Sequence, residues 1–376
     1  MTTKPLIYCD YNAGAPVRAE AAVAVARALA VGGNPSSVHG AGRRARALIE
    51  DAREKVGAAL DSRAENVVFT SGATEAVHLA LTSAGAAAFI VSSIEHDAAF
   101  EQASRSRDTD RFIPVGADGV VRLDALEALL QDARKPALVV LQLANNETGV
   151  IQPIARAAAL CRQYRAMLLV DAAQGFGRIP VSIVDLDATY LVVSSHKLGG
   201  PPGVGALVLA PGAPFVTSRF GGGQERGRRP GTENLAAIAG FGVAVEYALG
   251  ELETEQRRVR AMRDRFEANL PKDAIVFGAS APRLPNTSNF AMPGVSAETA
   301  VIAMDIEGVA VSSGAACSSG KVRSSRVLKA MGVAGDLAKS ALRVSFGHAS
   351  KETDVDAALA ALTKIAARRA LVGAAG

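Results

Sequence analysis

LVVSSHKLGGPPG, residues 191–203, joins an apolar strand to a lysine and then to a turn. The run Leu191, Val192 and Val193 is typical of a strand buried inside a sheet, and the glycines and prolines end it. Lys197 therefore follows directly on a buried strand, where an ammonium group is costly to remove from water. Such a lysine either extends into solvent or is held for chemistry. We interpret Lys197 as held for chemistry.

Short apolar runs alternate with alanine-rich helical patterns through the first 210 residues. Between the runs, stretches such as IARAAALCRQYRA (154–166) place apolar residues on one helical face. Strands that alternate with helices predict an α/β fold with a mostly parallel, doubly wound sheet, which binds ligands beyond the carboxyl ends of its strands. The strands are predicted at 66–70, 88–93, 137–144, 167–172, 189–195 and 205–210.

The length of 376 residues predicts about two domains, since a domain commonly holds ~150 residues. A long helical pattern, with Thr232 as its cap, covers residues 234–270 and is interpreted as a connector. We expect a large sheet domain over residues 15–260. A smaller α/β domain is expected from residues 1–14 together with residues 261–376.

Composition and charge exclude several classes of protein. The net charge is only +4, and the basic cluster QERGRRPGT (224–232) has no interleaved aromatic residues, so nucleic-acid binding is not expected. Three cysteines cannot form a disulfide framework, which favours a reducing compartment, and the cytoplasm is the expected location. The N-terminal residues lack the apolar core of a signal peptide. The uncharged stretch 76–94 contains too many polar residues for a membrane span and predicts a helix end, a turn and a strand.

Reactive side chains gather at the carboxyl ends of the predicted strands. Lys197, Asp171, Asn146 and His96 each follow one strand, and the turn 71–74 follows another. Taken singly, each of these is more typical of a turn, a helix cap or a packed side chain. Because the ends of parallel strands meet at one edge of a sheet, their joint occurrence favours a single site.

The ligand is suggested by the chemistry of this set. FTSGATE (69–75) places backbone N–H groups and Thr74 at a helix N-terminus, which suits a phosphate, although its spacing matches neither a P-loop nor a dinucleotide turn. A lysine for a Schiff base, an aspartate for a pyridinium proton and a phosphate cradle together describe pyridoxal 5′-phosphate. Burial and the neighbouring His196 are expected to lower the pKa of Lys197 and make the amine reactive.

Ten blocks of sequence, in order along nearly the whole chain, resemble those of the cysteine desulfurases. This family is a branch of the class V aminotransferases among the fold-type I pyridoxal-phosphate enzymes, and the resemblance implies that fold and a homodimer. YNAGAP and the pair Val77–His78 depart from the common pattern, which bears on substrate preference since both are expected beside the pocket. The blocks are YCDYNAGAP (8–16), GNPSSVHGAGRRAR (33–46), FTSGATEA (69–76), EHDA (95–98), NNETGVIQPI (145–154), VDAAQGFGRIP (170–180), SSHKLGGPPGVGAL (194–207), GGGQERGRRPGTEN (221–234), VSSGAACSS (311–319) and ALRVSFG (341–347).

The resemblance also implies a role for each matching residue. Lys197 would hold the cofactor covalently, Asp171 would pair with its ring nitrogen, and His96 would stack on its ring. Thr232 would reach the phosphate bound by the partner subunit. The remaining residues would bind the ring hydroxyl (Asn146, Gln174), the phosphate (Ala73, Thr74, Ser194, His196) and the substrate (Asn34, Asn146, Arg343), with Asn34 and Arg343 clamping its carboxylate.

Cys317 indicates which of the reactions supported by pyridoxal phosphate is expected. It lies in VSSGAACSSGKVRSS (311–325), where small residues leave little apolar surface to bury a thiol, so we interpret it as an accessible nucleophile. Cys9 and Cys161 lie among apolar residues and are expected to be inert core residues. The resemblance then implies that L-cysteine becomes L-alanine while Cys317 takes the sulfur as a persulfide, with His96 moving a proton. The sulfur would pass to an acceptor protein, most commonly for iron–sulfur cluster assembly.

Other functions remain open from the sequence alone. A selenocysteine lyase or another class V aminotransferase would use the same cofactor and the same pocket. A catalytically silent partner with this fold is disfavoured, because Lys197, Asp171, His96 and Cys317 are all present. No metal site is expected, since the histidines show neither HExxH nor paired CxxC spacing.

Overall fold

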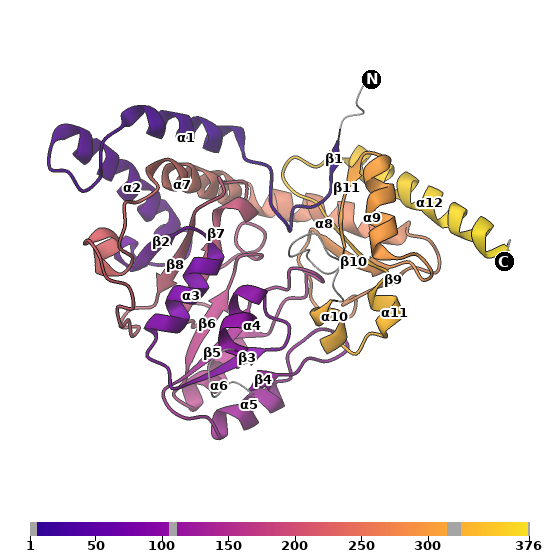
Figure 1. The fold of residues 1–376 in the computed structure, drawn as a ribbon, viewed down its shortest axis with the longest axis horizontal. Coiled ribbons are helices and arrows are strands. Elements are labelled where there is room, and N and C mark those ends of the chain that lie inside the picture. Colours follow the sequence, from indigo (N-terminus) through magenta and orange to yellow (C-terminus); the bar gives the residue numbers. More distant parts are fainter. Residues whose placement is uncertain (1–5, 105–110, 314–324, 375–376) are drawn as a thin grey trace.

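The computed structural model describes residues 6–104, 111–313 and 325–374, so Cys317 lies outside the described residues. The larger sheet has the strand order β2-β8-β7-β6-β5-β3-β4 (Figure 1). From β7 to β4 the strands run parallel, whereas β8 is antiparallel to both of its neighbours. The predicted mostly parallel sheet is therefore confirmed. Its strands are β2 (Val67–Thr70), β3 (Ala88–Ser92), β4 (Phe112–Ile113), β5 (Ala137–Gln142), β6 (Met167–Asp171), β7 (Tyr190–Ser194) and β8 (Gly205–Leu209).

Each strand predicted from the sequence begins and ends within two residues of the expected positions. β4 was not predicted, because two residues of edge strand carry no periodicity of their own. The inner strands β5 and β7 are buried along their whole length, which explains why their sequences are continuous apolar runs rather than alternating ones.

Helices cover both faces of this sheet. Successive residues of β5 point to opposite faces, so that Leu138 and Val140 belong to one core while Val139 and Leu141 belong to the other. α3 and α4 pack on the first face, and α2, α5, α6 and α7 pack on the second. The helices of this domain are α1 (Ala19–Val31), α2 (Gly40–Ala58), α3 (Ala73–Ser83), α4 (Asp97–Ser104), α5 (Leu123–Gln131), α6 (Ile154–Gln163) and α7 (Leu235–Gly250), with short 3₁₀ turns η1 (Ala64–Asn66), η2 (Ser195–Lys197) and η3 (Gln224–Gly227).

The expected single connector helix is wrong in two respects. Asn234, not Thr232, caps the helix, because its side chain accepts the N–H of Ala237 at 3.2 Å. The pattern is also divided into α7 and α8 (Leu252–Ala268), which meet at an angle of 72°. The bend arises because α7 is buried in the core of the large sheet, whereas Phe266 of α8 is buried in a separate second core.

The second core belongs to a smaller antiparallel sheet on the other side of the molecule (Figure 1). Its strand order is β12-β13-β10-β9, and a short parallel pair, β1 with β11, lies beside it. Cys9 joins this core from the N-terminal segment, which supports the domain limits expected from the sequence; those limits stay a prediction. The elements are β1 (Ile7–Tyr8), β9 (Ile275–Val276), β10 (Thr287–Ala291), α9 (Ala297–Ile306), β11 (Val309–Ala310), β12 (Ser312–Ser313), α10 (Arg326–Ala330), α11 (Gly335–Ala338), β13 (Ala341–Ser345) and α12 (Glu352–Ala374).

Within the described ranges, no single helix is long and apolar enough to cross a membrane; the bent pair α7 and α8 meets that criterion only when its two members are joined.

Candidate active site

The carboxyl ends of the central strands open into a pocket of about 690 Å³. Asp171 is the last residue of β6, and Lys197 ends the 3₁₀ turn that follows β7. The pocket lies where the large sheet faces the smaller domain, since Ser312 of β12 also lines it. The site residues predicted from the sequence that line this pocket are Ala73, Thr74, His96, Asn146, Asp171, Gln174, Ser194, His196, Lys197 and Arg343.

Two predicted residues lie elsewhere in this chain. Asn34 is exposed in the turn between α1 and α2, at the far left of Figure 1, and its Oδ1 accepts the N–H of Ser36 at 2.9 Å. Thr232 is exposed before α7. The structure does not bring Asn34 to the pocket, and a single chain does not test a contact of Thr232 with a partner subunit. Both roles stay predictions.

Val77 and His78, which depart from the common family pattern, were expected beside the pocket, but the structure places them away from it. Val77 is fully buried in the core under α3, and the ring of His78 is hydrogen-bonded to Gln102 of α4. Neither residue lines the pocket. The two residues therefore affect the packing of α3 rather than the selection of a substrate.

Lys197 is held by backbone and by its electrostatic surroundings. Its Nζ donates to the carbonyl oxygens of Asn12 at 2.6 Å and Ala13 at 2.9 Å. Burial lowers the pKa of Lys197 to about 7, and the positive charges of Arg178 and Arg343 act in the same direction. A large fraction of the amine is therefore neutral near pH 7, as a nucleophile or a base requires.

The sequence predicted that burial and His196 would lower the pKa of Lys197, and only the effect of burial is confirmed. Burial acts as expected, but His196 is not the neighbouring cation. Burial lowers the pKa of His196 itself to about 4, with Lys197 and Arg178 adding to the effect, so its ring is neutral near pH 7. The cations are the two arginines, which come from distant parts of the chain.

Asp171 is 8% exposed and faces the same pocket. Its Oδ1 accepts the N–H of Ala173 at 2.9 Å, which leaves the other carboxylate oxygen for a ligand. Burial raises the pKa of Asp171, and the hydrogen bond from Ala173 and the nearby His96 and Lys197 oppose that rise. A cationic ring nitrogen placed against this carboxylate would favour its ionised form in the same way.

The N-terminus of α3 forms one end of the pocket. Gly72 stands at its N-cap position and no side chain caps it, so the first backbone N–H groups are available to an anion. The one acidic residue of the first turn, Glu75, pairs with Arg219 and Arg229. Burial alone would raise the pKa of Glu75, but hydrogen bonds from Arg229 and Ser71 lower it to about 2. The carboxylate is thus neutralised, and the helix N-terminus stays suited to a phosphate.

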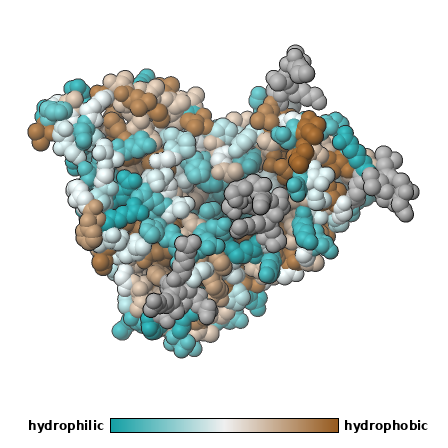
Figure 2. Space-filling view, viewed as in Figure 1, coloured by the Kyte–Doolittle hydropathy of each residue, from teal (hydrophilic) through white to brown (hydrophobic). Residues whose placement is uncertain are grey.

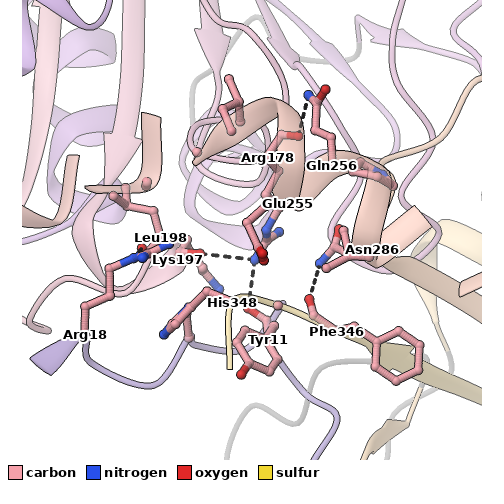
Figure 3. A pocket seen from close by; sticks show the side chains of 17 residues that line it. Tyr11, Arg18, Arg178, Lys197, Leu198, Glu255, Gln256, Asn286, Phe346 and His348 are labelled. Carbon is pink, nitrogen blue, oxygen red and sulfur yellow. Dashed lines mark hydrogen bonds between the residues drawn. The ribbon is translucent and has the colours of Figure 1, made fainter. Parts of the chain in front are cut away.

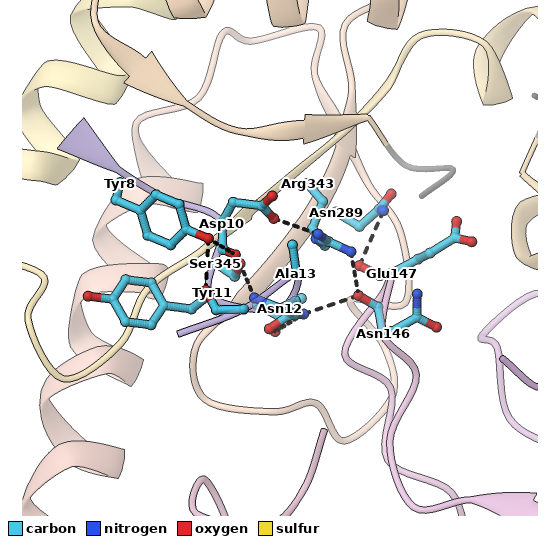
Figure 4. Close-up of polar contacts among 12 residues, drawn as sticks. Tyr8, Asp10, Tyr11, Asn12, Ala13, Asn146, Glu147, Asn289, Arg343 and Ser345 are labelled. Atoms are coloured by element: carbon cyan, nitrogen blue, oxygen red, sulfur yellow. Dashed lines mark hydrogen bonds and ion pairs between the residues drawn. The ribbon is translucent and has the colours of Figure 1, made fainter. Parts of the chain in front are cut away.

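Arg343 also lines the pocket, and Figure 4 shows the polar contacts around it. It lies in β13 with its side chain 2% exposed. Its Nη1 donates to the carbonyl oxygen of Asn146 at 3.0 Å, and its Nη2 donates to Asp10 Oδ1 at 2.5 Å. Among the described residues, its buried Nε has no hydrogen-bond partner. A buried guanidinium with an unused donor beside a pocket is suited to a carboxylate.

Arg178 is a functional neighbour that the sequence analysis missed. It donates to the carbonyl oxygens of Tyr11 at 2.8 Å and Lys197 at 3.3 Å (Figure 3), and it also donates to the carbonyl oxygen of Gln174 at 3.2 Å. Burial lowers the pKa of Arg178 to about 9, with Arg343 contributing. The side chain lines a small cavity of about 40 Å³ on the other side of Lys197, which has room for water but not for a substrate. The local sequence VDAAQGFGRIP (170–180) does not indicate this role, because it depends on contacts with Tyr11 and Lys197 outside the block.

Three further ionisable groups are buried: Glu95, directly before His96, and the two described cysteines, which lie in the two hydrophobic cores. Burial raises the pKa of Glu95 well above its usual value, and its Oε1 accepts the N–H of Gln142 at 2.7 Å. Cys9 and Cys161 are 0% and 3% exposed, and burial raises the pKa of each thiol to about 12. Both are buried as the sequence predicted.

These groups fit pyridoxal 5′-phosphate. The pocket combines an uncapped helix N-terminus, a buried aspartate and a lysine whose amine is partly neutral at pH 7. In the part of the chain that the structure describes, no three or more His, Cys, Asp and Glu residues are grouped to hold a metal ion. The fold and this set of groups define the class: an α/β enzyme of the pyridoxal-phosphate-dependent kind.

Comparison with known proteins identifies the family. The profile described as "Aminotransferase class-V" matches residues 7–358. The chain is 36% identical to "Cysteine desulfurase IscS" of Dictyoglomus turgidum, over 96% of this chain and 94% of that protein. It is 40% identical to "Cysteine desulfurase" of Cereibacter sphaeroides, over 96% and 95% of the two chains. The crystal structure of a NifS-like protein from Rickettsia africae matches with a TM-score of 0.90 and 32% identity, covering 96% of this chain and 99% of that one. The chain belongs to the cysteine desulfurase family of the class V aminotransferases.

Proposed function

We propose that this protein is a pyridoxal-phosphate-dependent cysteine desulfurase that converts L-cysteine to L-alanine and takes the sulfur as a persulfide on Cys317. The observation that carries the proposal is the shared pocket of Lys197, Asp171 and Arg343, which supplies an amine, an acid and a carboxylate-binding group at one sheet edge. The names of the related cysteine desulfurases support the same reaction.

Each residue has a task that follows from its surroundings. Bound pyridoxal phosphate supplies the sink for electrons released at the substrate Cα. Lys197 binds the cofactor and, with its lowered pKa, takes up and returns a proton near neutral pH. Asp171 holds a proton on the ring nitrogen, and the start of α3 with Ser194 and His196 binds the phosphate. Ser194 Oγ and His196 Nδ1 lie 3.1 Å apart, so the hydroxyl and the ring orient each other.

The substrate end of the pocket is formed by Arg343 and Asn146. Nη1 and Nη2 of Arg343 each keep a second N–H beyond the bonds to Asn146 and Asp10, and one of these can donate to the carboxylate of cysteine, which would orient the substrate with its Cα toward Lys197. His96 stands in the pocket wall, where it can stack on the cofactor and move a proton at the substrate thiol. Cys317 would then take the sulfur and pass it to an acceptor protein, for iron–sulfur cluster assembly in the cytoplasm.

A homodimer is part of this proposal. α1 carries exposed apolar side chains, including Val23 and Leu29, which are 49% and 70% exposed, and Figure 2 shows this apolar surface at the upper left. A groove between α1 and α7 continues it to Tyr247. An apolar surface of this kind is typical of an interface with another protein. Light scattering of the purified protein should give twice the 38.6 kDa of one chain.

The test is turnover of the purified protein with L-cysteine and a reductant, measuring alanine and sulfide together. Lys197→Ala should lose both the visible absorbance of the bound cofactor and turnover. Cys317→Ala should stay yellow and cofactor-loaded but form no persulfide. L-selenocysteine and a keto acid, tested as alternative substrates, separate a lyase or an aminotransferase from a desulfurase. Unchanged turnover in Lys197→Ala would refute the proposal.

A further inference from the structure

The turn that carries His96 is held by side chains from both domains. Three successive carbonyl oxygens precede the histidine, those of Ser93, Ile94 and Glu95. A side-chain amide of β5 donates to the middle one at 2.7 Å. The two outer carbonyls both accept from Arg326, the first residue of α10 in the smaller domain. One guanidinium therefore spans the segment immediately before His96.

The contacts of Arg326 use both edges and one face of its guanidinium. Nη1 donates to Ser93 O at 3.0 Å, and Nη2 donates to Glu95 O at 2.6 Å and to Asp97 Oδ1 at 2.8 Å. The Cζ atom lies 3.7 Å from the ring centroid of Phe100, which places a cation over an aromatic ring. These four partners lie on either side of His96 in the chain. Lysine has no planar fork with which to span the two carbonyls.

The His96 ring is hydrogen-bonded to the backbone of this turn. Its Nδ1 accepts the N–H of Ala98 at 3.1 Å, and its carbonyl oxygen accepts the N–H groups of Ala99 and Phe100 at 2.9 and 3.0 Å. The ring is thus bonded to the first turn of α4, the helix that begins at Asp97. A shift of the 93–97 backbone must therefore carry the ring with it.

α10 is itself attached firmly to the large domain. Ile94 is buried in one cluster with Val327 and Leu328. Ser325 caps α10 by accepting the N–H of Leu328 at 3.0 Å, and its hydroxyl donates to the buried Glu147 at 2.5 Å. The start of α10 therefore contacts the turn before His96 and also Glu147, the residue after Asn146, and α10 faces this end of the sheet in Figure 1.

We infer that Arg326 is a positioning residue, through which the smaller domain sets where His96 lies against the cofactor and the substrate. The inference rests on the proposed function for the role of His96, but the contacts of Arg326 do not depend on the cofactor. A displacement of a catalytic group by about 1 Å can reduce a rate up to ~100-fold. Loss of the Arg326 hydrogen bonds to the 93–97 turn should therefore reduce turnover without removing the cofactor.

The first measurement is amide hydrogen exchange of the apoprotein, which does not require activity. In Arg326→Ala, exchange of the peptide covering residues 93–100 should become faster than in the unaltered protein. Arg265→Ala is the matched control. Arg265 also donates to a backbone carbonyl, Glu352 O at 2.6 Å, and its side chain is 38% exposed against 30% for Arg326, but it joins α8 to α12. The control should leave the 93–100 peptide unchanged.

The second measurement is a double-mutant cycle on the cofactor-loaded enzyme. Arg326→Ala should lower kcat about 10- to 100-fold, with cofactor content retained and KM changed little. Arg326→Lys should restore only part of the loss. In a His96→Ala background, Arg326→Ala should cost almost nothing further, because both changes remove the same function. The visible circular dichroism of the cofactor should change in the same direction in Arg326→Ala and His96→Ala.

The outcomes distinguish the positioning role of Arg326 from the proposed catalytic role of His96. Unchanged exchange at residues 93–100 and unchanged kcat in Arg326→Ala would overturn the inference. So would a full additional loss in the His96→Ala background, since Arg326 would then act by another route. A His96→Ala enzyme with normal turnover would instead contradict the proposed role of His96. Faster exchange of residues 93–100 in Arg326→Ala would still show that Arg326 holds this turn.

Discussion

Asp10 Oδ1 lies 2.5 Å from Arg343 Nη2, so a carboxylate of the protein itself contacts the guanidinium expected to bind the substrate. The two residues are held together by β-structure, since Asp10 forms a parallel bridge to Ser345, two residues beyond Arg343. The pair is buried on the arginine side and 17% exposed on the aspartate side. Asp10 therefore stabilises a buried cation and at the same time reduces the positive charge that attracts the substrate.

Asp10→Asn should separate these two effects. The amide oxygen can still accept from Arg343, but the negative charge is gone, so the carboxylate of cysteine meets a less neutralised guanidinium. We expect KM for cysteine to fall several-fold, and the melting temperature to fall as well, because a buried charge loses its counter-ion. Steady-state kinetics and thermal unfolding measure the two effects. Asp336→Asn, at a fully exposed side chain, is the control, and a higher KM in Asp10→Asn would contradict the expectation.

The pKa of Lys197 predicts how cofactor binding to the apoprotein depends on pH. Only the neutral amine attacks an aldehyde, so the rate of reconstitution should rise with pH through a midpoint at about 7. Arg178→Gln removes a positive charge that lowers this pKa, and its midpoint should move to higher pH. Arg178→Lys keeps the charge and serves as the control. Stopped-flow absorbance of the bound cofactor gives the rates, and a midpoint near that of free lysine in the unaltered apoprotein would contradict the assignment.

Breaking the buried ion pair of Arg53 and Glu225 is expected to destabilise the protein strongly. Both residues are buried, their two hydrogen bonds are 2.7 and 2.9 Å long, and Glu225 also accepts the N–H of Phe69 at 2.9 Å. Removal of one partner from a buried pair leaves an uncompensated charge, which costs about 3–5 kcal/mol. Glu225→Gln should lower the free energy of unfolding by that amount in urea titrations.

The matched control for this pair is Glu253→Gln. Glu253 lies 3.8 Å from Arg257 on α8, with the two side chains 87% and 72% exposed. An exposed pair of this kind contributes about 0–1 kcal/mol. Equal losses in Glu225→Gln and Glu253→Gln would show that burial of the Arg53 pair does not matter.

The cysteines predict one reactive thiol in the native protein. With a pKa of about 12, Cys9 and Cys161 are thiolates in only about one molecule in ten thousand at pH 8, and both are buried. An aromatic disulfide reagent should therefore modify one thiol rapidly, and Cys317→Ala should remove that fast phase. Unfolding in urea should expose the other two thiols. A fast phase that persists in Cys317→Ala would assign the reactive thiol to another cysteine.

The large sheet and most of the pocket could be predicted from the amino-acid sequence. Strands such as 137–142 are continuous apolar runs because both faces are covered by helices, and such runs end where the chain leaves the core. Polar residues directly after them, such as Asp171 and Lys197, must then lie at the edge where parallel strands end. These features depend on local periodicity and on strand direction, which a sequence contains.

The contacts between charged residues could not be predicted from the sequence. Asp10 contacts Arg343, and Arg326 holds the turn before His96, although the partners in both pairs are more than 200 residues apart in the chain. Arg178, rather than the adjacent His196, is the cation near Lys197. The bend between α7 and α8 follows Gly250, a residue typical of a helix end, but its angle depends on the two separate cores in which the helices are buried. Electrostatic and hydrogen-bond contacts act over a few ångströms in space, and sequence spacing does not give that separation.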